Sequence, residues 1–226
     1  MNMELDRARY RLALDALVLP RFAAGLAAPP FVVALEGPNG TGKSTLCRSL
    51  CQALETPGCL GTDALWFAEP LKTRMIAEAD WFASAMFFLS GCFEQMRMLR
   101  NSPAPLVIMD RCLWSTLAVH AAESPERLAA LLAMLRPVAG EVRVPSLTLV
   151  LEASLAACQT RIAQKTGAAR ALDALTATAP FHAREEDFYH WLGRQVPTVV
   201  FLDVERASPA EVLEKAAALI RQRVPC

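Results

Sequence analysis

Residues 31–46 read Phe-Val-Val-Ala-Leu-Glu-Gly-Pro-Asn-Gly-Thr-Gly-Lys-Ser-Thr-Leu, and this stretch decides the fold. The apolar run at 31–35 is typical of a strand that is buried in a parallel sheet. The segment from Gly37 to Ser44 fits the pattern G-x-x-x-x-G-K-[ST] at every fixed position. Residues 44–54 can continue as a helix. The chain therefore has the strand, glycine loop and helix in which this motif occurs.

The residue types of this loop suit a phosphate-binding site. Its glycines allow positive φ angles and a close approach of the backbone to an anion, and the N–H groups at the start of the helix point at that anion. We expect the loop to bind ATP, with Lys43 neutralising the β- and γ-phosphates and the Ser44 hydroxyl binding Mg²⁺. A glycine-rich turn that fits the motif by chance is the alternative. The expected nucleotide-binding residues are Gly37, Pro38, Asn39, Gly40, Thr41, Gly42, Lys43, Ser44 and Thr45.

Length and composition exclude several classes of protein. The chain has 226 residues, of which 54% are hydrophobic, and this is enough for one domain with a sizeable core. The formal net charge is zero and Lys and Arg are spread along the chain, which argues against a nucleic-acid polymer as partner. No apolar run reaches the roughly 18 residues of a membrane span. The seven cysteines lack metal-binding spacing, and their odd number favours the reducing cytoplasm.

Short apolar stretches alternate with helical patterns along the chain. This alternation predicts an α/β fold of the P-loop NTPase type, with a five-stranded parallel sheet and helices on both faces. The expected strands lie at 31–35, 64–68, 106–109, 146–151 and 198–202. We assign residues 1–30 to an N-terminal helical extension and residues 31–226 to the main domain, with a helical lid near 152–180.

Polar residues mark the starts of three of the expected helices. Asp80 is the predicted cap of a long helix at 81–99, and Ser124 precedes a proline that opens a helix at 125–136. Ser208 and Glu211 form a capping box ahead of the last helix.

A second acid should lie beside the phosphate loop to hold Mg²⁺ directly or through water. The third expected strand ends at Asp110, and the carboxyl ends of parallel strands line the ligand crevice in this class of sheet. Asp110 is therefore the expected second metal ligand. A helix cap is the alternative role for such an acid.

Three segments in order resemble the thymidylate kinase and deoxynucleoside kinase group: Glu36 to Thr45, then Glu69-Pro70, then Asp110-Arg111 followed by Ser115. The similarity runs from about residue 31 to residue 222. It implies ATP-dependent phosphoryl transfer to a nucleoside or a nucleoside monophosphate, in a protein that is commonly dimeric.

The resemblance also implies roles for four residues outside the loop. Arg111 would hold the acceptor or the transferring phosphate, and Glu69 would accept the proton of a sugar 5′-hydroxyl as a general base. Phe88 would stack on the acceptor base. Arg161 would be a lid arginine that stabilises the charge on the transferring phosphoryl group.

Several positions depart from the thymidylate kinase pattern. Ala68 and Cys92 stand where that family has arginines, and Asn39 stands where it has an acid in the loop. A dianionic acceptor needs cationic partners, so these departures leave two alternatives open. One is a nucleotide-binding regulatory protein that has lost acceptor phosphorylation. The other is a kinase for a small molecule that is not a nucleoside.

Overall fold

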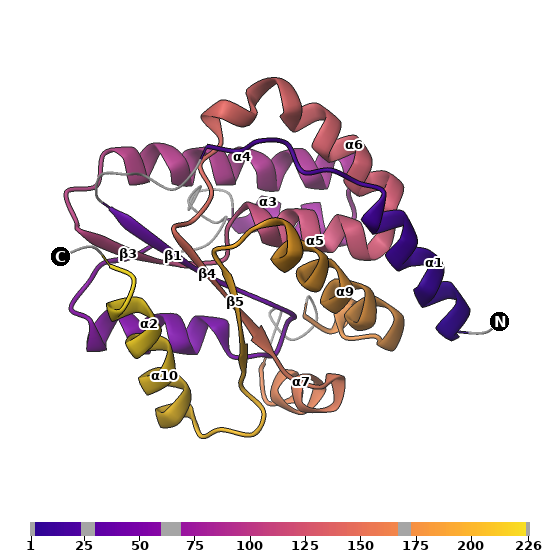
Figure 1. Ribbon diagram of the computed structural model, residues 1–226. Helices are drawn as coiled ribbons and strands as arrows, with labels where there is room; N and C mark the ends of the chain where they lie inside the picture. The colour runs from indigo at the N-terminus through magenta and orange to yellow at the C-terminus, as the bar shows by residue number, and fades with distance from the viewer. Residues whose placement is uncertain (1–2, 24–29, 60–68, 167–172, 225–226) are drawn as a thin grey trace.

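The computed structural model describes residues 3–23, 30–59, 69–166 and 173–224. Strand β1 (Phe31–Glu36) lies at the centre of a parallel sheet, between β3 (Leu106–Asp110) and β4 (Leu147–Glu152). Strand β5 (Val199–Asp203) pairs with β4, and β2 (Gly58–Cys59) pairs with β3, which gives the order β2-β3-β1-β4-β5 (Figure 1). The predicted α/β fold with a parallel sheet is confirmed.

The predicted five-stranded sheet is present only in part. Four strands have five or six residues, and the remaining edge position holds only the two-residue β2. We expected a strand at 64–68, and this range lies outside the described residues. Glu69 is helical, because α3 (Glu69–Ala77) begins at this residue. A proline at the second helical position suits the first turn, where its missing N–H costs nothing.

The remaining helices follow the expected order along the chain. They are α1 (Met3–Asp15), α2 (Lys43–Ala53), α4 (Trp81–Arg100), α5 (Leu113–Glu123), α6 (Pro125–Leu135), α7 (Leu155–Ala163), α9 (Ala179–Gln195) and α10 (Pro209–Arg221). A 3₁₀ segment (Arg136–Glu141) follows α6, and residues 173–176 are also helical.

Alternate residues of β1 face two separate hydrophobic cores. Val32 and Ala34 pack with residues of α1, α4, α5, α6 and α9, whereas Val33 and Leu35 pack with α2 and α10. Figure 1 shows these two groups of helices on opposite faces of the sheet. Burial on both faces explains why the strand sequence is apolar throughout instead of alternating.

The predicted helix caps are present. The Asp80 carboxylate accepts hydrogen bonds from the N–H groups of Phe82 and Ala83, at 2.8 and 3.0 Å. The Ser124 hydroxyl accepts from the N–H of Glu126, and Ser208 with Glu211 forms the complete capping box. These short local patterns could be read from the sequence because the side chains and their partners lie within three residues.

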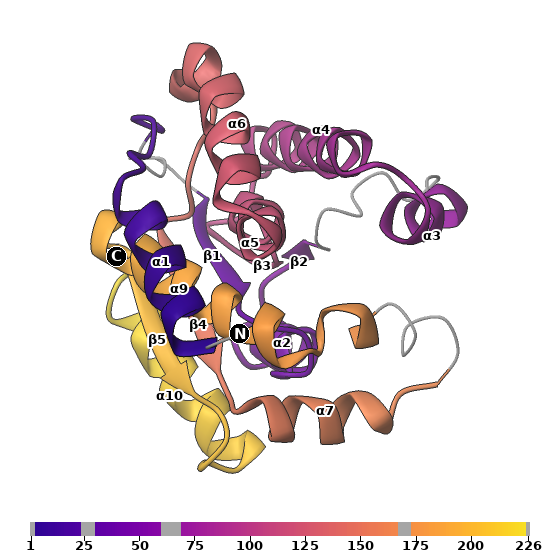
Figure 2. The ribbon, with the colours of Figure 1, turned by 90° about the vertical axis from the view of Figure 1, so that its right-hand side faces the viewer.

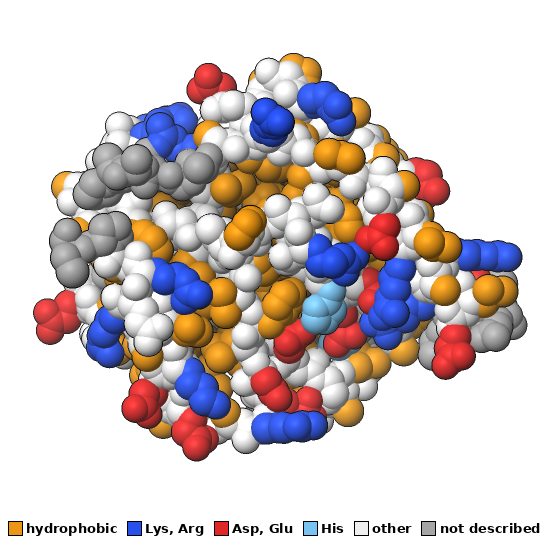
Figure 3. All heavy atoms as spheres, in the orientation of Figure 1, with side chains coloured by type: hydrophobic (Ala, Val, Ile, Leu, Met, Phe, Trp, Pro, Cys, Tyr) orange, Lys and Arg blue, Asp and Glu red, His pale blue; other side chains and the backbone are white. Residues whose placement is uncertain are grey.

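The surface carries both signs of charge. On the face in Figure 3, basic and acidic side chains lie intermixed over α9 and the neighbouring α1. Within the described ranges, no helix is long and apolar enough to cross a membrane.

Candidate active site

The glycine loop between β1 and α2 has the backbone that its sequence predicts. Gly37, Gly40 and Gly42 have φ angles of 120°, 87° and 97°, a region that other residues rarely adopt. A Cβ atom on Gly37 would lie 2.4 Å from the carbonyl oxygen of Leu151, and one on Gly40 would lie 2.5 Å from that of Cys158. At these two positions the loop backbone lies directly against β4 and α7, so only glycine fits there.

Lys43 is buried within this loop, with 5% of its surface exposed. Its ammonium group donates hydrogen bonds to the carbonyl oxygens of Gly37 and Pro38, both at 2.6 Å. Burial, followed by the charge of Arg111, lowers the pKa of Lys43 to about 7. The lysine of the motif thus lies at the centre of the loop, where burial removes most of the water around its ammonium group.

Asp110 lies beside the loop, as the sequence predicts. It pairs in register with Leu35, two residues before Gly37, and its negative charge acts on Lys43. Ser44 lies in the first turn of α2 and is exposed. One carboxylate, one hydroxyl and phosphate oxygens suit Mg²⁺, which keeps several waters and uses few protein ligands. Within the described residues, no cluster of three or more His, Cys, Asp or Glu could hold a metal ion by itself.

Arg111 reaches across the mouth of the loop. Its backbone has a φ of 76°, an uncommon angle for a residue with a side chain. The guanidinium donates to the Ser115 hydroxyl at 2.9 Å and to the Asn39 side-chain oxygen. Asn39, which replaces an expected acid, therefore serves as an acceptor for Arg111. The strained backbone at Arg111 is typical of residues held at functional sites.

The carboxylate of Glu36, the last residue of β1, is fully buried at this site. It accepts hydrogen bonds from the Cys112 N–H at 2.8 Å, the Cys112 thiol at 3.1 Å, the Tyr189 hydroxyl at 3.0 Å and the Ser115 hydroxyl. We gave Glu36 no role from the sequence. The signal that identified Asp110, an acid at the end of an apolar strand, also applies to Glu36.

A second buried acid, Glu185 of α9, faces the same charges. It is 3% exposed, and burial raises its pKa while Arg111 and Lys43 lower it. Within the described part of the chain it has no side-chain hydrogen bond. Glu185 and Tyr189 are four residues apart, so they share one face of α9. Nothing in the sequence distinguished this face of α9 from the opposite one.

Two segments within the range that we expected to form a lid, α7 and residues 173–176, contact the glycine loop. Arg161 of α7 donates to the carbonyl oxygen of Val204 at 2.9 Å and to those of Gly40 and Thr41 at 3.5 Å. It therefore joins the glycine loop to the segment after β5. The Asn39 amide also donates to the Thr176 hydroxyl at 2.9 Å, which ties the lid segment to the loop.

The structure describes the residues expected to contact an acceptor less completely. Phe88 is half-buried on α4, and its ring packs edge-on against Phe87 at 5.1 Å. Cys92, one turn further along α4, is 1% exposed, and its sulfur lies 3.8 Å from the Thr116 hydroxyl on α5. This face of α4 therefore points toward the start of α5, next to Arg111. Glu69 begins α3, and its side chain lies outside the described part of the structure.

Two solved structures share this architecture. A thymidylate kinase from Candida albicans superposes with a TM-score of 0.64 and 18% identity, over 87% of this chain and 93% of that one. A deoxyadenosine kinase from M. mycoides with bound dATP superposes with a TM-score of 0.62 and 14% identity, over 84% of this chain and 99% of that one. At these identities the likeness establishes the fold alone. It confirms the fold that the resemblance predicted.

Sequence comparison gives a family but no individual relative. No curated protein matches the chain. Residues 32–183 match the model of a family described as an AAA domain, and these residues include the phosphate loop, Asp110, Arg111 and α7. Because the match covers more than half of the chain and the fold is that of the P-loop kinases, the chain belongs to this AAA-domain family.

Proposed function

We propose that the protein is an ATP-dependent phosphotransferase whose acceptor is a nucleoside or a nucleoside monophosphate. The observation that carries this proposal is the convergence of Lys43, Asp110 and Arg111 around one glycine loop. A loop that only bound nucleotide would need the lysine and the acid. The arginine across the loop mouth is an additional cation, which would stabilise the charge that develops on a transferring phosphoryl group.

ATP would bind with its phosphates in the loop from Gly37 to Thr45. On binding, the Lys43 ammonium would exchange its bonds to the loop carbonyls for bonds to β- and γ-phosphate oxygens. Ser44 and Asp110 would hold Mg²⁺, which neutralises phosphate charge when it is bound. Arg161 would keep the loop and the segment after β5 together at the nucleotide end of the site.

In the transfer step, the acceptor oxygen would form a bond to the γ-phosphorus while the bond to the β,γ-bridging oxygen breaks and ADP leaves. Arg111 would stabilise the charge that spreads over the transferring group. Glu69 would take the acceptor proton, and Phe88 would contact the acceptor base. Closure of the lid near 152–180 would exclude water, so that the acceptor and not water is phosphorylated.

The acceptor side favours an uncharged nucleoside over a monophosphate. Cys92 stands where an arginine would pair with an acceptor phosphate, and it is buried against Thr116 instead of facing a ligand. A dianionic phosphate in a cleft loses its hydration and needs charge-assisted hydrogen bonds in return. We expect nucleosides to have a kcat/KM at least about tenfold above that of the corresponding monophosphates, the ratio for one lost charged hydrogen bond.

A coupled ADP-release assay over a panel of nucleosides and monophosphates tests this proposal. Acceptor-dependent turnover that requires Mg²⁺ supports it, and the ranking of the panel tests the preference for nucleosides. Turnover that does not depend on any acceptor in the panel contradicts the proposal. Mass spectrometry of the phosphorylated product identifies the hydroxyl that is modified.

The loss of cations on the acceptor side also favours a second candidate. A nucleotide-binding regulatory protein would keep the loop and the buried Lys43 but would not phosphorylate an acceptor. Tight ATP binding by calorimetry without turnover on any acceptor would favour it. Turnover on a small molecule outside the panel would instead indicate a kinase for another acceptor class.

Whichever of these functions applies, we propose that the protein is cytoplasmic and forms a homodimer.

A further inference from the structure

Helix α9 connects the reaction site to the N-terminal helix, which lies outside the region matched by the family model. Figures 1 and 2 both show α1 lying alongside α9. One face of α9 carries Glu185 and Tyr189 toward the glycine loop. Another carries Asp187, which points to α1. The two faces belong to one rigid helix, so a contact on the outside can fix the position of groups on the inside.

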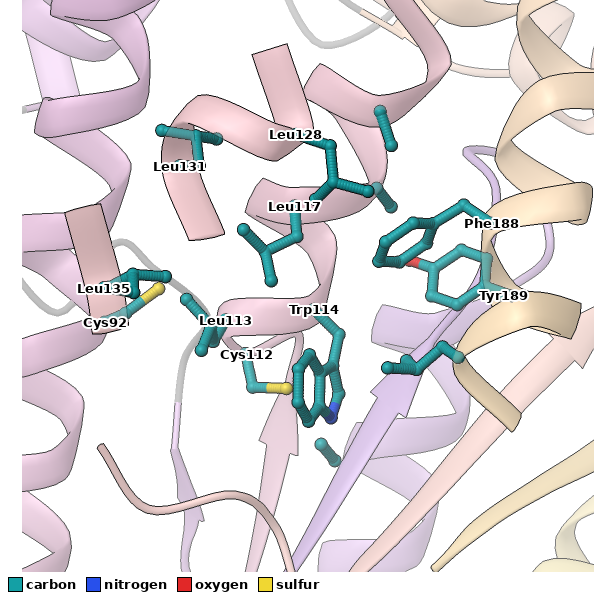
Figure 4. Packing of buried hydrophobic residues seen from close by; sticks show 14 of the residues in the cluster. Cys92, Cys112, Leu113, Trp114, Leu117, Leu128, Leu131, Leu135, Phe188 and Tyr189 are labelled. Atoms are coloured by element: carbon teal, nitrogen blue, oxygen red, sulfur yellow. The ribbon is translucent and has the colours of Figure 1, made fainter. Parts of the chain in front are cut away.

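On the inner face, Tyr189 begins a chain of hydrogen bonds that ends at Arg111. The Tyr189 hydroxyl donates to Glu36 at 3.0 Å, and the Ser115 hydroxyl donates to the same carboxylate oxygen. Ser115 in turn accepts from the Arg111 guanidinium at 2.9 Å. Figure 4 shows Phe188 and Tyr189 reaching from α9 toward Trp114 on α5. A displacement of α9 would therefore reach Arg111 through three hydrogen bonds, which join Tyr189 to Glu36, Glu36 to Ser115 and Ser115 to Arg111.

On the outer face, α1 supplies both cations that hold Asp187. The Arg7 guanidinium donates to the two carboxylate oxygens of Asp187 at 2.7 and 2.9 Å, and Arg11 donates to one of them at 2.8 Å. The Asp187 side chain is only 3% exposed, so water solvates its negative charge only weakly. Two-point arginine pairing fixes orientation as well as distance.

Apolar and ring contacts reinforce this attachment. Tyr10 and Leu14 of α1 are 5% and 1% exposed and belong to the same core as Phe188. The Tyr10 hydroxyl donates to the carbonyl oxygen of Arg184 at 3.1 Å, and the Arg184 guanidinium lies over the Tyr10 ring. The helix α1 thus packs as part of the main core and not as a loose extension.

We propose that α1 is a positioning element of the reaction site: through Asp187 it fixes α9, and through Tyr189 and Glu36 it fixes Arg111. This inference rests on the proposed phosphotransfer for its kinetic consequence. The chain of contacts itself can be tested without any turnover. Neither α1 nor Asp187 belongs to the residues proposed to bind ATP or the acceptor, and α1 makes most of its helix contacts with α9, so we expect their effect to pass through α9.

The first test is a double-mutant cycle between the outer and inner faces of α9. The outer change is Arg7→Ala with Arg11→Ala, and the inner change is Tyr189→Phe, which removes one hydroxyl. Each alone should lower kcat by about three- to tenfold with little change in the KM for ATP, the usual range for coupling between sites. Combined, they should cost no more than the larger single effect, because both break the same chain.

The matched control is Arg9→Ala, which removes an exposed arginine from the same helix without touching Asp187. It should leave kcat unchanged. Losses that add in the combined variant, or an equal loss in Arg9→Ala, would overturn the proposal. If the double arginine variant does not fold, Arg7→Ala alone leaves Arg11 on Asp187 and serves as the outer change.

The second test measures amide hydrogen exchange over residues 110–118 in the free protein. The Cys112 N–H is bonded to Glu36, so its protection reports directly on the carboxylate that Tyr189 holds. Exchange there should speed up in both the outer and the inner variants and stay unchanged in Arg9→Ala. Unchanged exchange in the outer variant overturns the proposal, whether or not the wild-type protein phosphorylates any acceptor. Failure of the proposed function alone would leave this exchange pattern intact.

Discussion

The proposed donor side and the proposed acceptor side of this site differ in how they are built. On the donor side, backbone N–H groups, three glycines with positive φ and one buried lysine form the loop. On the proposed acceptor side, the identity of single side chains on α3, α4 and α5 would decide what can bind. A site formed by backbone geometry can be recognised in the sequence from the spacing of its glycines. A site formed by side chains of different helices cannot, because it depends on which helices pack together. The donor side is therefore the better predicted of the two.

The largest effect is expected from Lys43→Ala, which removes the charge at the centre of the donor side. We expect kcat/KM to fall by about a thousandfold, in the range for lost transition-state electrostatics. Turnover by the coupled ADP-release assay and the melting temperature would be measured together. Lys215→Ala, an exposed lysine on α10, is the control and should keep full activity. Equal activity in the two variants would contradict the assignment of the loop.

Arg111 lies between the two sides, so its substitution tests whether it acts in nucleotide binding or in the transfer step. Arg111→Lys keeps the charge but loses the planar fork whose two terminal nitrogens bond Ser115 and Asn39. We expect a loss of about a hundredfold in kcat for Arg111→Ala and a smaller loss for Arg111→Lys. Arg97→Ala is the control, because Arg97 pairs with Glu94 on the exposed face of α4. A loss confined to the KM for ATP would place Arg111 in nucleotide binding only.

The pH dependence of nucleotide binding tests the burial of Lys43. Its pKa is lowered to about 7, and a bound phosphate would raise it again, so ADP binding above pH 7 should take up a proton. The affinity should then fall by about tenfold per pH unit above 7. Calorimetry at pH 8 in two buffers of different ionisation enthalpy reports the proton uptake. Binding that neither takes up a proton nor weakens between pH 7 and 9 contradicts this assignment.

The smallest effects are expected at two helix caps, one on each side of the comparison. Asp80→Ala on α4 and Ser208→Ala on α10 should each lower the free energy of unfolding by about 1 kcal/mol. Only Asp80→Ala should also raise the KM for the acceptor, since α4 carries Phe88. Urea denaturation and acceptor titration measure the two quantities. A change in the KM for the acceptor in Ser208→Ala would contradict this prediction, because α10 would then influence acceptor binding as well.

Local patterns explain which parts of the fold could be predicted. The four full strands, the caps of α4, α6 and α10, and the loop conformation follow from apolar runs and short-range hydrogen bonds. The edge of the sheet was harder to predict. A two-residue strand at Gly58–Cys59 has no pattern of its own and exists because β3 offers it a partner. Helix α3 was not predicted, because its residues form no pronounced apolar face.

The sequence alone determined the glycine loop, its lysine and the acid at the end of β3. These residues lie within one short segment and one neighbouring strand, so their spacing along the chain is enough to identify them. Only the tertiary structure decided that Glu36, Ser115, Tyr189 and Arg111 form one network, since they come from a strand, a loop and two helices. It also decided that α1 holds α9 through Asp187, across 180 residues of chain. Contacts between residues so distant in sequence leave no local pattern, because they depend on how the helices pack.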